Sequence, residues 1–135
     1  MRSDRGQALL ELALCAPVLI LLAVGVAAVV QVEDAGAGLD AATHAAASVA
    51  ARAPDPATAD IAAHTRFASI VNGYQLYEAT LHISFGSFTR AGELTATAEA
   101  FADVGWAELV LPRRLEVRAQ AVVQLEPWRT HRAAA

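Results

Sequence analysis

The sequence is poor in the residues that build metal sites, disulfides and nucleic-acid interfaces. Its 135 residues include no lysine, one cysteine and four histidines, and aromatic residues make up only 6%. One cysteine cannot form an internal disulfide, and no cysteine or histidine cluster has zinc-ligand spacing. The formal net charge of −4 at pH 7 lacks the basic excess typical of nucleic-acid-binding domains. We therefore expect no metal, no cofactor and no nucleic-acid partner.

Charged residues are scarce, and apolar residues are abundant. Hydrophobic residues make up 56% and charged residues 18%, although 33 residues are alanine, so much of the apolar share is small side chains. This composition excludes a disordered chain. The sequence contains no nucleophile elbow and no metal-binding helix motif. Gly36-Ala37-Gly38 is not a phosphate loop, because no Gly-Lys-Ser/Thr follows it. We therefore expect neither an enzyme nor a small-molecule substrate.

The longest apolar run lies near the N-terminus. Nineteen residues from Leu12 to Val30 carry no charge, and a helix of that length covers roughly 28 Å, close to the hydrocarbon thickness of a bilayer. Arg2 and Arg5 precede the run and two acids follow it. Positive charge before a first membrane helix stays on the cytoplasmic side. The run predicts a single-pass helix in the inner membrane, with a cytoplasmic N-terminus and an extracytoplasmic C-terminal domain.

Two other interpretations fit this run less well. A helix buried in a soluble core would need more chain around it than the remaining residues provide. A removable secretory signal has an apolar core of only about 7–15 residues before a small-x-small cleavage site. Ala35-Gly36-Ala37 has the composition of such a site, but the run is longer and two acids lie between them. The pattern favours a retained membrane helix.

One acid at the start of the run does not fit a plain anchor. Glu11 stands next to the first residue of the run, where a carboxylate at the bilayer boundary is costly. No cation follows within helical reach, and Arg5 lies six residues back, a poor spacing for pairing on one helix. Either Glu11 lies in the headgroup layer, or it has a partner on another molecule.

The residues around Glu11 form a pattern. A short basic leader ends in Gly6, Glu11 stands five residues later, and Pro17 follows six residues further on. This pattern resembles the leader of type IV pilin-like proteins, and more closely that of TadE-like minor pilins (pseudopilins) of the tight-adherence (Tad/Flp) pilus. The resemblance is strong over Arg5–Val32 and only general beyond it. Leu12 stands where an aromatic residue is common in such pilins, which leaves the subfamily open.

The resemblance implies a processing site and an assembly element. A prepilin peptidase would cut between Gly6 and Gln7, where the absence of a side chain lets a protease approach the backbone. The new α-amine of Gln7 would pair with Glu11 of a neighbouring subunit, and Pro17 would kink or loosen the helix. The implied partners are the prepilin peptidase, other Tad pilins and the pilus assembly platform. The alternatives are a membrane-anchored exported binding or sensor module and a secreted domain freed of its signal.

Beyond the membrane run, the sequence predicts an α+β fold. A helical extension over residues 33–53, loosened near Gly36 and Gly38, carries an apolar stripe at helical spacing. That stripe is Leu39, Ala42, Ala46, Val49 and Ala53. A second helix should begin at Pro56 with Asp55 as its N-cap. It should end near Val71 before Asn72-Gly73. Its expected apolar side holds Ala57, Ile61, His64, Ala68 and Val71, with Phe67 beside them and His64 as a partly buried structural residue.

Three stretches of alternating residues predict an antiparallel sheet with one apolar face. The apolar positions are 77–85, 94–102 and 115–123, each at every second residue. The segment Gly105–Arg114 between the last two strands should either cover the sheet edge or present a contact surface, and the first is favoured. The expected organisation is a leader (1–6), a transmembrane helix (7–32), the helical extension (33–53), a small α+β domain (54–127) and a flexible tail (128–135).

Overall fold

The computed structural model describes residues 2–88 and 92–125, and it confirms the expected α+β fold. The elements are α1 (Arg2–Arg52), α2 (Pro56–Val71), β1 (Leu76–Phe85), β2 (Glu93–Asp103), the short 3-10 helix η1 (Gly105–Ala107) and β3 (Arg114–Gln124). The expected tail, and the last residues of the expected α+β domain, lie outside the described residues.

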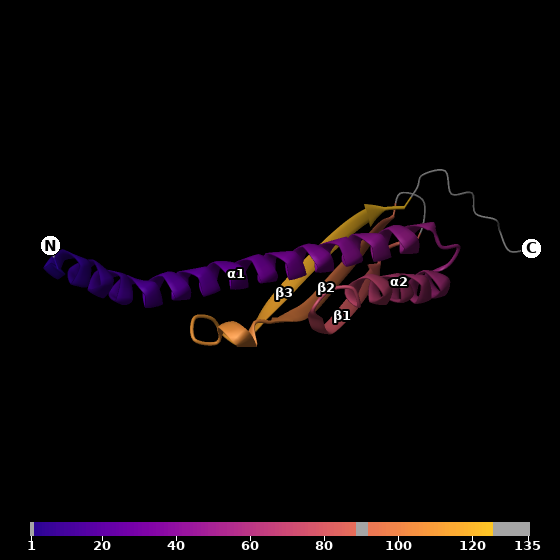
Figure 1. Ribbon diagram of the computed structural model, residues 1–135. Helices are drawn as coiled ribbons and strands as arrows, with labels where there is room; N and C mark the ends of the chain where they lie inside the picture. The colour runs from indigo at the N-terminus through magenta and orange to yellow at the C-terminus, as the bar shows by residue number, and fades with distance from the viewer. Residues whose placement is uncertain (1, 89–91, 126–135) are drawn as a thin grey trace, which may run out of the picture.

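The molecule has a compact body and one projecting helix (Figure 1). The three strands form an antiparallel sheet in the order β1-β2-β3. The C-terminal part of α1 packs on this sheet and against α2, while the N-terminal part extends well beyond the body. Two segments of α1 therefore have different surroundings. We call residues 4–30 the bare segment and residues 35–52 the packed segment.

α1 is one continuous helix, and the expected loosening near Gly36 and Gly38 is wrong. The two glycines have different surroundings. A Cβ atom at Gly38 would lie 2.5 Å from ring atoms of Tyr74, whereas a Cβ atom at Gly36 would meet nothing within 4 Å. Gly38 therefore permits a close approach between α1 and the turn after α2. Two glycines in a helix lower its intrinsic stability, but packing against the body keeps this part helical.

α2 begins and ends where the sequence predicts. The Asp55 side chain accepts a hydrogen bond from the backbone N–H of Thr58 at 2.9 Å, and Pro56 occupies the first helical position. This bond from Thr58, which stabilises the ionised carboxylate, holds the pKa of Asp55 below its ordinary value of 3.8. Asn72 caps the C-terminal end.

The buried face of α2 differs from the expected one. The buried residues are Ala59, Ala63, Phe67 and Val71, whereas Ile61 is 69% exposed and Ala57, His64 and Ala68 are also exposed. Alanine occurs on nearly every side of this helix, so its periodicity does not define one face. Burial of the large Phe67 ring decides the orientation.

His64 is an exposed residue of α2, which corrects the expectation of partial burial. Its Nδ1 lies 2.9 Å from the carbonyl oxygen of Asp60, and its Nε2 lies 3.3 Å from the carbonyl oxygen of Leu81 on β1. The ring therefore bridges α2 and the sheet, a structural role.

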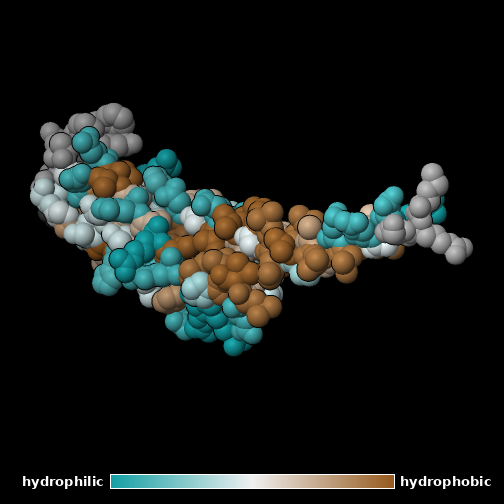
Figure 2. All heavy atoms as spheres, turned by 90° about the vertical axis from the view of Figure 1, so that its left-hand side faces the viewer, coloured by the Kyte–Doolittle hydropathy of each residue, from teal (hydrophilic) through white to brown (hydrophobic). Residues whose placement is uncertain are grey.

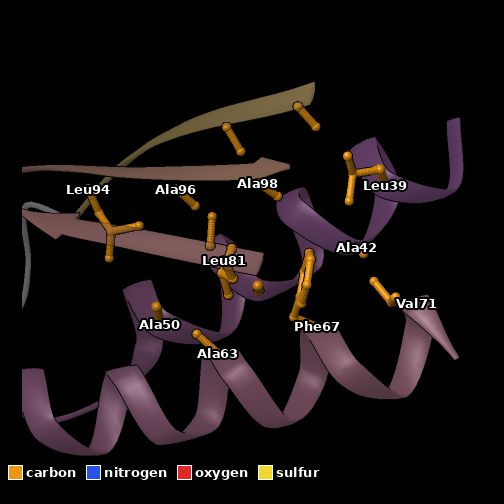
Figure 3. Close-up of a cluster of buried hydrophobic side chains, with 14 of the residues drawn as sticks. Leu39, Ala42, Ala50, Ala63, Phe67, Val71, Leu81, Leu94, Ala96 and Ala98 are labelled. Atoms are coloured by element: carbon orange, nitrogen blue, oxygen red, sulfur yellow. The ribbon is translucent and has the colours of Figure 1, made fainter. Parts of the chain in front are cut away.

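The core between the helices and the sheet is built mostly from alanine (Figure 3). Ala50 of α1 lies near Ala63 of α2, Ala42 of α1 lies near Val71 of α2, and Ala96 and Ala98 supply the facing surface of β2. Larger side chains, among them Leu39, Phe67 and Leu94, fill the space around them. Because alanine has no side chain beyond Cβ, the layers pack closely and leave little room for larger residues.

The sheet follows the predicted strands, with one change of phase in β1. Tyr77 pairs with Phe101 and Thr80 pairs with Glu99, so β1 contains one extra residue between these pairs. Glu78 in this bulge has a φ of 53°, in the left-handed region. The bulge turns Leu76 toward the core and leaves Tyr77 48% exposed. The expected place of Tyr77 on the apolar face is therefore wrong.

Candidate functional site

The bare segment is apolar and has almost no contact with the rest of the chain. The most apolar window of α1 is long and apolar enough to cross a membrane, and only 6% of it is buried. Twelve of its large side chains are 48% to 69% exposed, whereas Val24 is half-buried and Ala28 is buried near the body. The interpretation of this run as the core helix of a soluble domain is therefore wrong for this chain.

The Gly6–Gln7 peptide bond lies in the second turn of α1 and is open to approach. Gly6 is exposed, and a Cβ atom added to it would meet no protein atom within 4 Å. The first four N–H groups of α1, those of residues 2–5, have no partner within the helix, so few hydrogen bonds hold the turn before this bond. A glycine costs the helix about 0.5–1 kcal/mol relative to alanine. Local unwinding, which a protease needs, is therefore cheap at this bond.

Glu11 lies four residues after Gln7 in α1, so their side chains share one face of the helix. Glu11 is exposed, and its carboxylate forms no ion pair within the part of the chain that the structure describes. The structure thus places Gly6, Gln7 and Glu11 within two turns on the bare segment. A carboxylate in this position can accept a charged partner from another molecule.

Pro17 lies inside α1 and does not interrupt it. Proline has no N–H, so the carbonyl four residues earlier loses its helical hydrogen bond. Figure 1 shows the helix axis bending in its indigo N-terminal third, the part that contains Pro17. The kink that the sequence predicts therefore accompanies a continuous helix. Cys15, two residues earlier, is exposed.

Gln31 joins the bare segment to the body, and the sequence analysis did not identify it. Its Nε2 donates to the carbonyl oxygen of Asp103 at 3.0 Å, and its Oε1 accepts a hydrogen bond from the indole N–H of Trp106 at 2.7 Å. Both partners lie more than 70 residues away in the sequence. The one available signal was an amide directly after the uncharged run.

The segment after β2 extends along the bare segment and does not cover the sheet edge, which corrects the favoured expectation. We call residues 105–111 the apolar loop. Trp106 is 55% exposed, Leu109 is 91% exposed and Val110 is 44% exposed. In Figure 1 the loop, coloured orange, lies beside α1 and points toward the N-terminus.

An apolar hollow separates this loop from α1. Its volume is about 410 Å³, and its lining is wholly apolar: Leu21, Leu22, Gly25, Val26, Val29, Val30, Val110 and Leu111. Figure 2 shows the hydrophobic surface of the helix broadening into a lobe on one side. The apolar surface of the bare segment therefore continues onto the body.

Among the described residues, most titratable groups outside α1's apolar run are exposed to solvent. Two histidine–aspartate contacts follow helical spacing, with His44–Asp40 at 3.5 Å and His64–Asp60 at 3.4 Å. Across residues 2–88 and 92–125, no three side chains of histidine, cysteine, aspartate or glutamate gather where a metal ion would bind. The feature with the most distinctive chemistry is the bare segment with its Gly6–Gln7 bond and Glu11.

Comparisons with protein-family models, curated proteins and solved structures give no match for this chain. Functional inference therefore rests on the residues and geometry described above.

Proposed function

We propose that this protein is a TadE-like minor pilin (pseudopilin), a structural subunit for assembly of a tight-adherence type IV pilus. One observation carries the proposal: a single helix is half packed and half bare, and the bare segment holds an exposed Gly6–Gln7 bond and a Glu11 that forms no ion pair with any residue the structure describes. A purely structural anchor needs neither feature. Both features suit a subunit that is trimmed in the membrane and then assembled through its helix.

The bare segment would lie in the inner membrane, with the leader in the cytoplasm and the body on the other side. Burying a large aliphatic side chain contributes about 1.5–3 kcal/mol, and twelve such side chains from Leu9 to Val30 are exposed. Leaving all of them in water would be very unfavourable. Hydrocarbon is the solvent that fits this surface, and the two leader arginines favour a cytoplasmic N-terminus.

Trimming would create the second half of a charge pair. Cleavage after Gly6 gives Gln7 an α-amine at the membrane face, and Glu11 of a neighbouring subunit would accept its charge. Pairing relieves two charges in a poorly solvated place, whereas an unpaired carboxylate there is costly. The partners under this proposal are a prepilin peptidase, other Tad pilins and the assembly platform.

The structure disfavours cleavage at the alternative signal site. Ala35 is 5% exposed, Ala37 is exposed, and both lie inside continuous α1, where the nearby Gly38 closely approaches Tyr74. A signal peptidase would have to unwind helix that is packed on the body. A generic membrane-anchored module also remains less suitable, because it has no use for Glu11.

Glu11→Ala is the substitution that tests the proposal in the native host. We expect processed subunit at normal or higher abundance, because a costly carboxylate has left the membrane boundary. Pilus yield should fall about tenfold or more, because removing one partner of a poorly solvated ion pair costs about 3–5 kcal/mol. The measurements are sheared-pilus yield and an immunoblot of the processed subunit.

Two matched variants separate charge from side-chain shape. Glu11→Gln keeps the shape without the charge and should fail like Glu11→Ala. Glu11→Asp keeps the charge on a shorter side chain and should retain part of the yield. Normal piliation in Glu11→Ala would refute the charge pair and favour the generic anchored module.

A further inference from the structure

We propose that the apolar loop, residues 105–111, inserts into the extracytoplasmic leaflet beside α1, where lipid acyl chains fill the hollow between them. This inference rests on the membrane insertion of the bare segment, but it does not depend on pilus assembly. It assigns a second membrane contact to the body, separate from the transmembrane helix.

The position of the apolar loop along α1 indicates how deeply the loop would lie in the membrane. Val110 Cγ1 lies 3.7 Å from the place a Cβ atom would occupy on Gly25. Gly25 stands five residues before Val30, where the uncharged run ends, which is about 7.5 Å along a helix axis. Elements that lie in the membrane interface bury their apolar faces about 5–10 Å. With α1 across the bilayer, Val110 lies within that depth.

The exposure of the loop also points to hydrocarbon. Leu109 is 91% exposed, more than any other large apolar side chain among the described residues. In water, an exposed leucine at the tip of the loop would contribute no free energy of burial. The hydrophobic surface of α1 continues onto this side of the body (Figure 2), so one solvent can cover both.

The polar groups around the loop fit a headgroup layer. The Trp106 indole donates to Gln31 at the end of the apolar run, and tryptophan with its polar N–H is favoured at membrane interfaces. Arg113 and Arg114 follow the loop, and Arg114 also contacts Glu78 at 3.3 Å. Glu108 is exposed and lies next to Leu109, so it would remain among the headgroups.

Lipid fits this surface better than a second copy of the chain. The hollow is lined by the half of the apolar run nearest the body, and every side chain around it is apolar. Such a site needs no directional partner, and acyl chains adapt to its shape. A helix from a second subunit is the competing occupant, and protein dilution distinguishes the two.

The test measures thiol accessibility of the full-length chain in vesicles of phosphatidylethanolamine and phosphatidylglycerol. Cys15→Ala removes the one native thiol, and single cysteines are then introduced as L109C, I61C and L19C. Ile61 is 69% exposed on α2 and serves as the aqueous control. Leu19 lies in the middle of the bare segment and serves as the membrane control. The reagent is a charged, membrane-impermeant methanethiosulfonate.

We expect L109C and L19C to react at least about tenfold more slowly than I61C, because a charged reagent does not enter hydrocarbon and a thiol there resists ionisation to the reactive thiolate. The rate at L109C should not change when the protein is diluted into excess lipid. Rapid reaction at L109C with L19C protected would overturn the loop inference and leave the membrane anchor intact. Protection of L109C that disappears on dilution would assign the hollow to a second copy. Rapid reaction at both positions would overturn the membrane anchor as well.

Discussion

The bare and packed segments of α1 belong to one helix but differ in side-chain size. In the bare segment the large exposed side chains are leucine, isoleucine and valine, with Leu14 69% exposed and Leu22 65% exposed. In the packed segment the contact positions are mostly alanine, and Ala42, Ala46 and Ala50 are fully buried. Small residues let α1 pack closely on α2 and the sheet. Large aliphatic residues instead expose apolar area that hydrocarbon can cover without a fitted protein surface.

The comparison separates two roles along the helix. Stability of the body should depend on the packed segment, because that is where α1 has neighbours to lose. The bare segment should instead govern location, processing and assembly. Substitutions of the same type in the two segments test this division, and they are taken here from the largest expected effect to the smallest.

Adding volume distinguishes the segments most strongly. Ala46→Leu inserts three carbon atoms at a fully buried site in the alanine core and should lower the free energy of unfolding by about 1–3 kcal/mol or more. Ala27→Leu makes the same change at an exposed site of the bare segment and should leave it within about 0.5 kcal/mol. Urea unfolding of the full chain in mild detergent, followed by tryptophan fluorescence, measures both. Equal losses would contradict the division.

Glycine-to-alanine changes test the contact within the packed segment. Gly38→Ala places a methyl group against the Tyr74 ring and should lower stability by about 1 kcal/mol or more. Gly36→Ala, two residues away in open space, should raise stability by about 0.5–1 kcal/mol because alanine favours the helix. The same unfolding assay applies. Stabilisation by both changes would show that Tyr74 moves aside freely.

The smallest expected effect is a pH dependence confined to the body. The folded-state pKa of Asp55 is lowered by the Thr58 N–H bond. The ionised Asp55 carboxylate therefore stabilises the folded state fully above the ordinary pKa of 3.8. This stabilisation is lost as the pH falls through the lower folded-state pKa. Asp55→Asn keeps an N-cap that does not titrate. Comparing unfolding at pH 5 and at pH 2, wild type should lose more stability than Asp55→Asn, and identical losses would refute the assignment.

Much of the body could be predicted because its local signals are strong. Alternation defined all three strands, and Pro56 with Asp55 defined the start of α2. The side of α2 that is buried could not be predicted, since alanine lies on most of its faces. The outward position of Tyr77 depends on a bulge at Glu78, where no glycine marks the left-handed conformation.

The candidate site divides in the same way. The resemblance to pilin leaders groups Gly6, Gln7, Glu11 and Pro17, and because all four lie on one helix their closeness follows from the sequence alone. Gln31 and the apolar loop come together only through long-range packing, and Trp106 lies 75 residues from its hydrogen-bond partner. The general tendency of large apolar residues to be buried led to the wrong prediction for the loop, because Trp106, Leu109 and Val110 are exposed beside α1.

The N-terminus of the mature subunit tests the central claim most directly. Intact-protein and N-terminal peptide mass spectrometry of membranes from the native host should find a chain that begins at Gln7, with or without cyclisation of that residue. Gly6→Leu should retain Met1, and since position 6 is exposed and a Cβ atom there meets no protein atom within 4 Å, this result would report on the peptidase and not on folding. A wild-type chain that begins at Met1, or one that begins beyond Ala37, would contradict the claim.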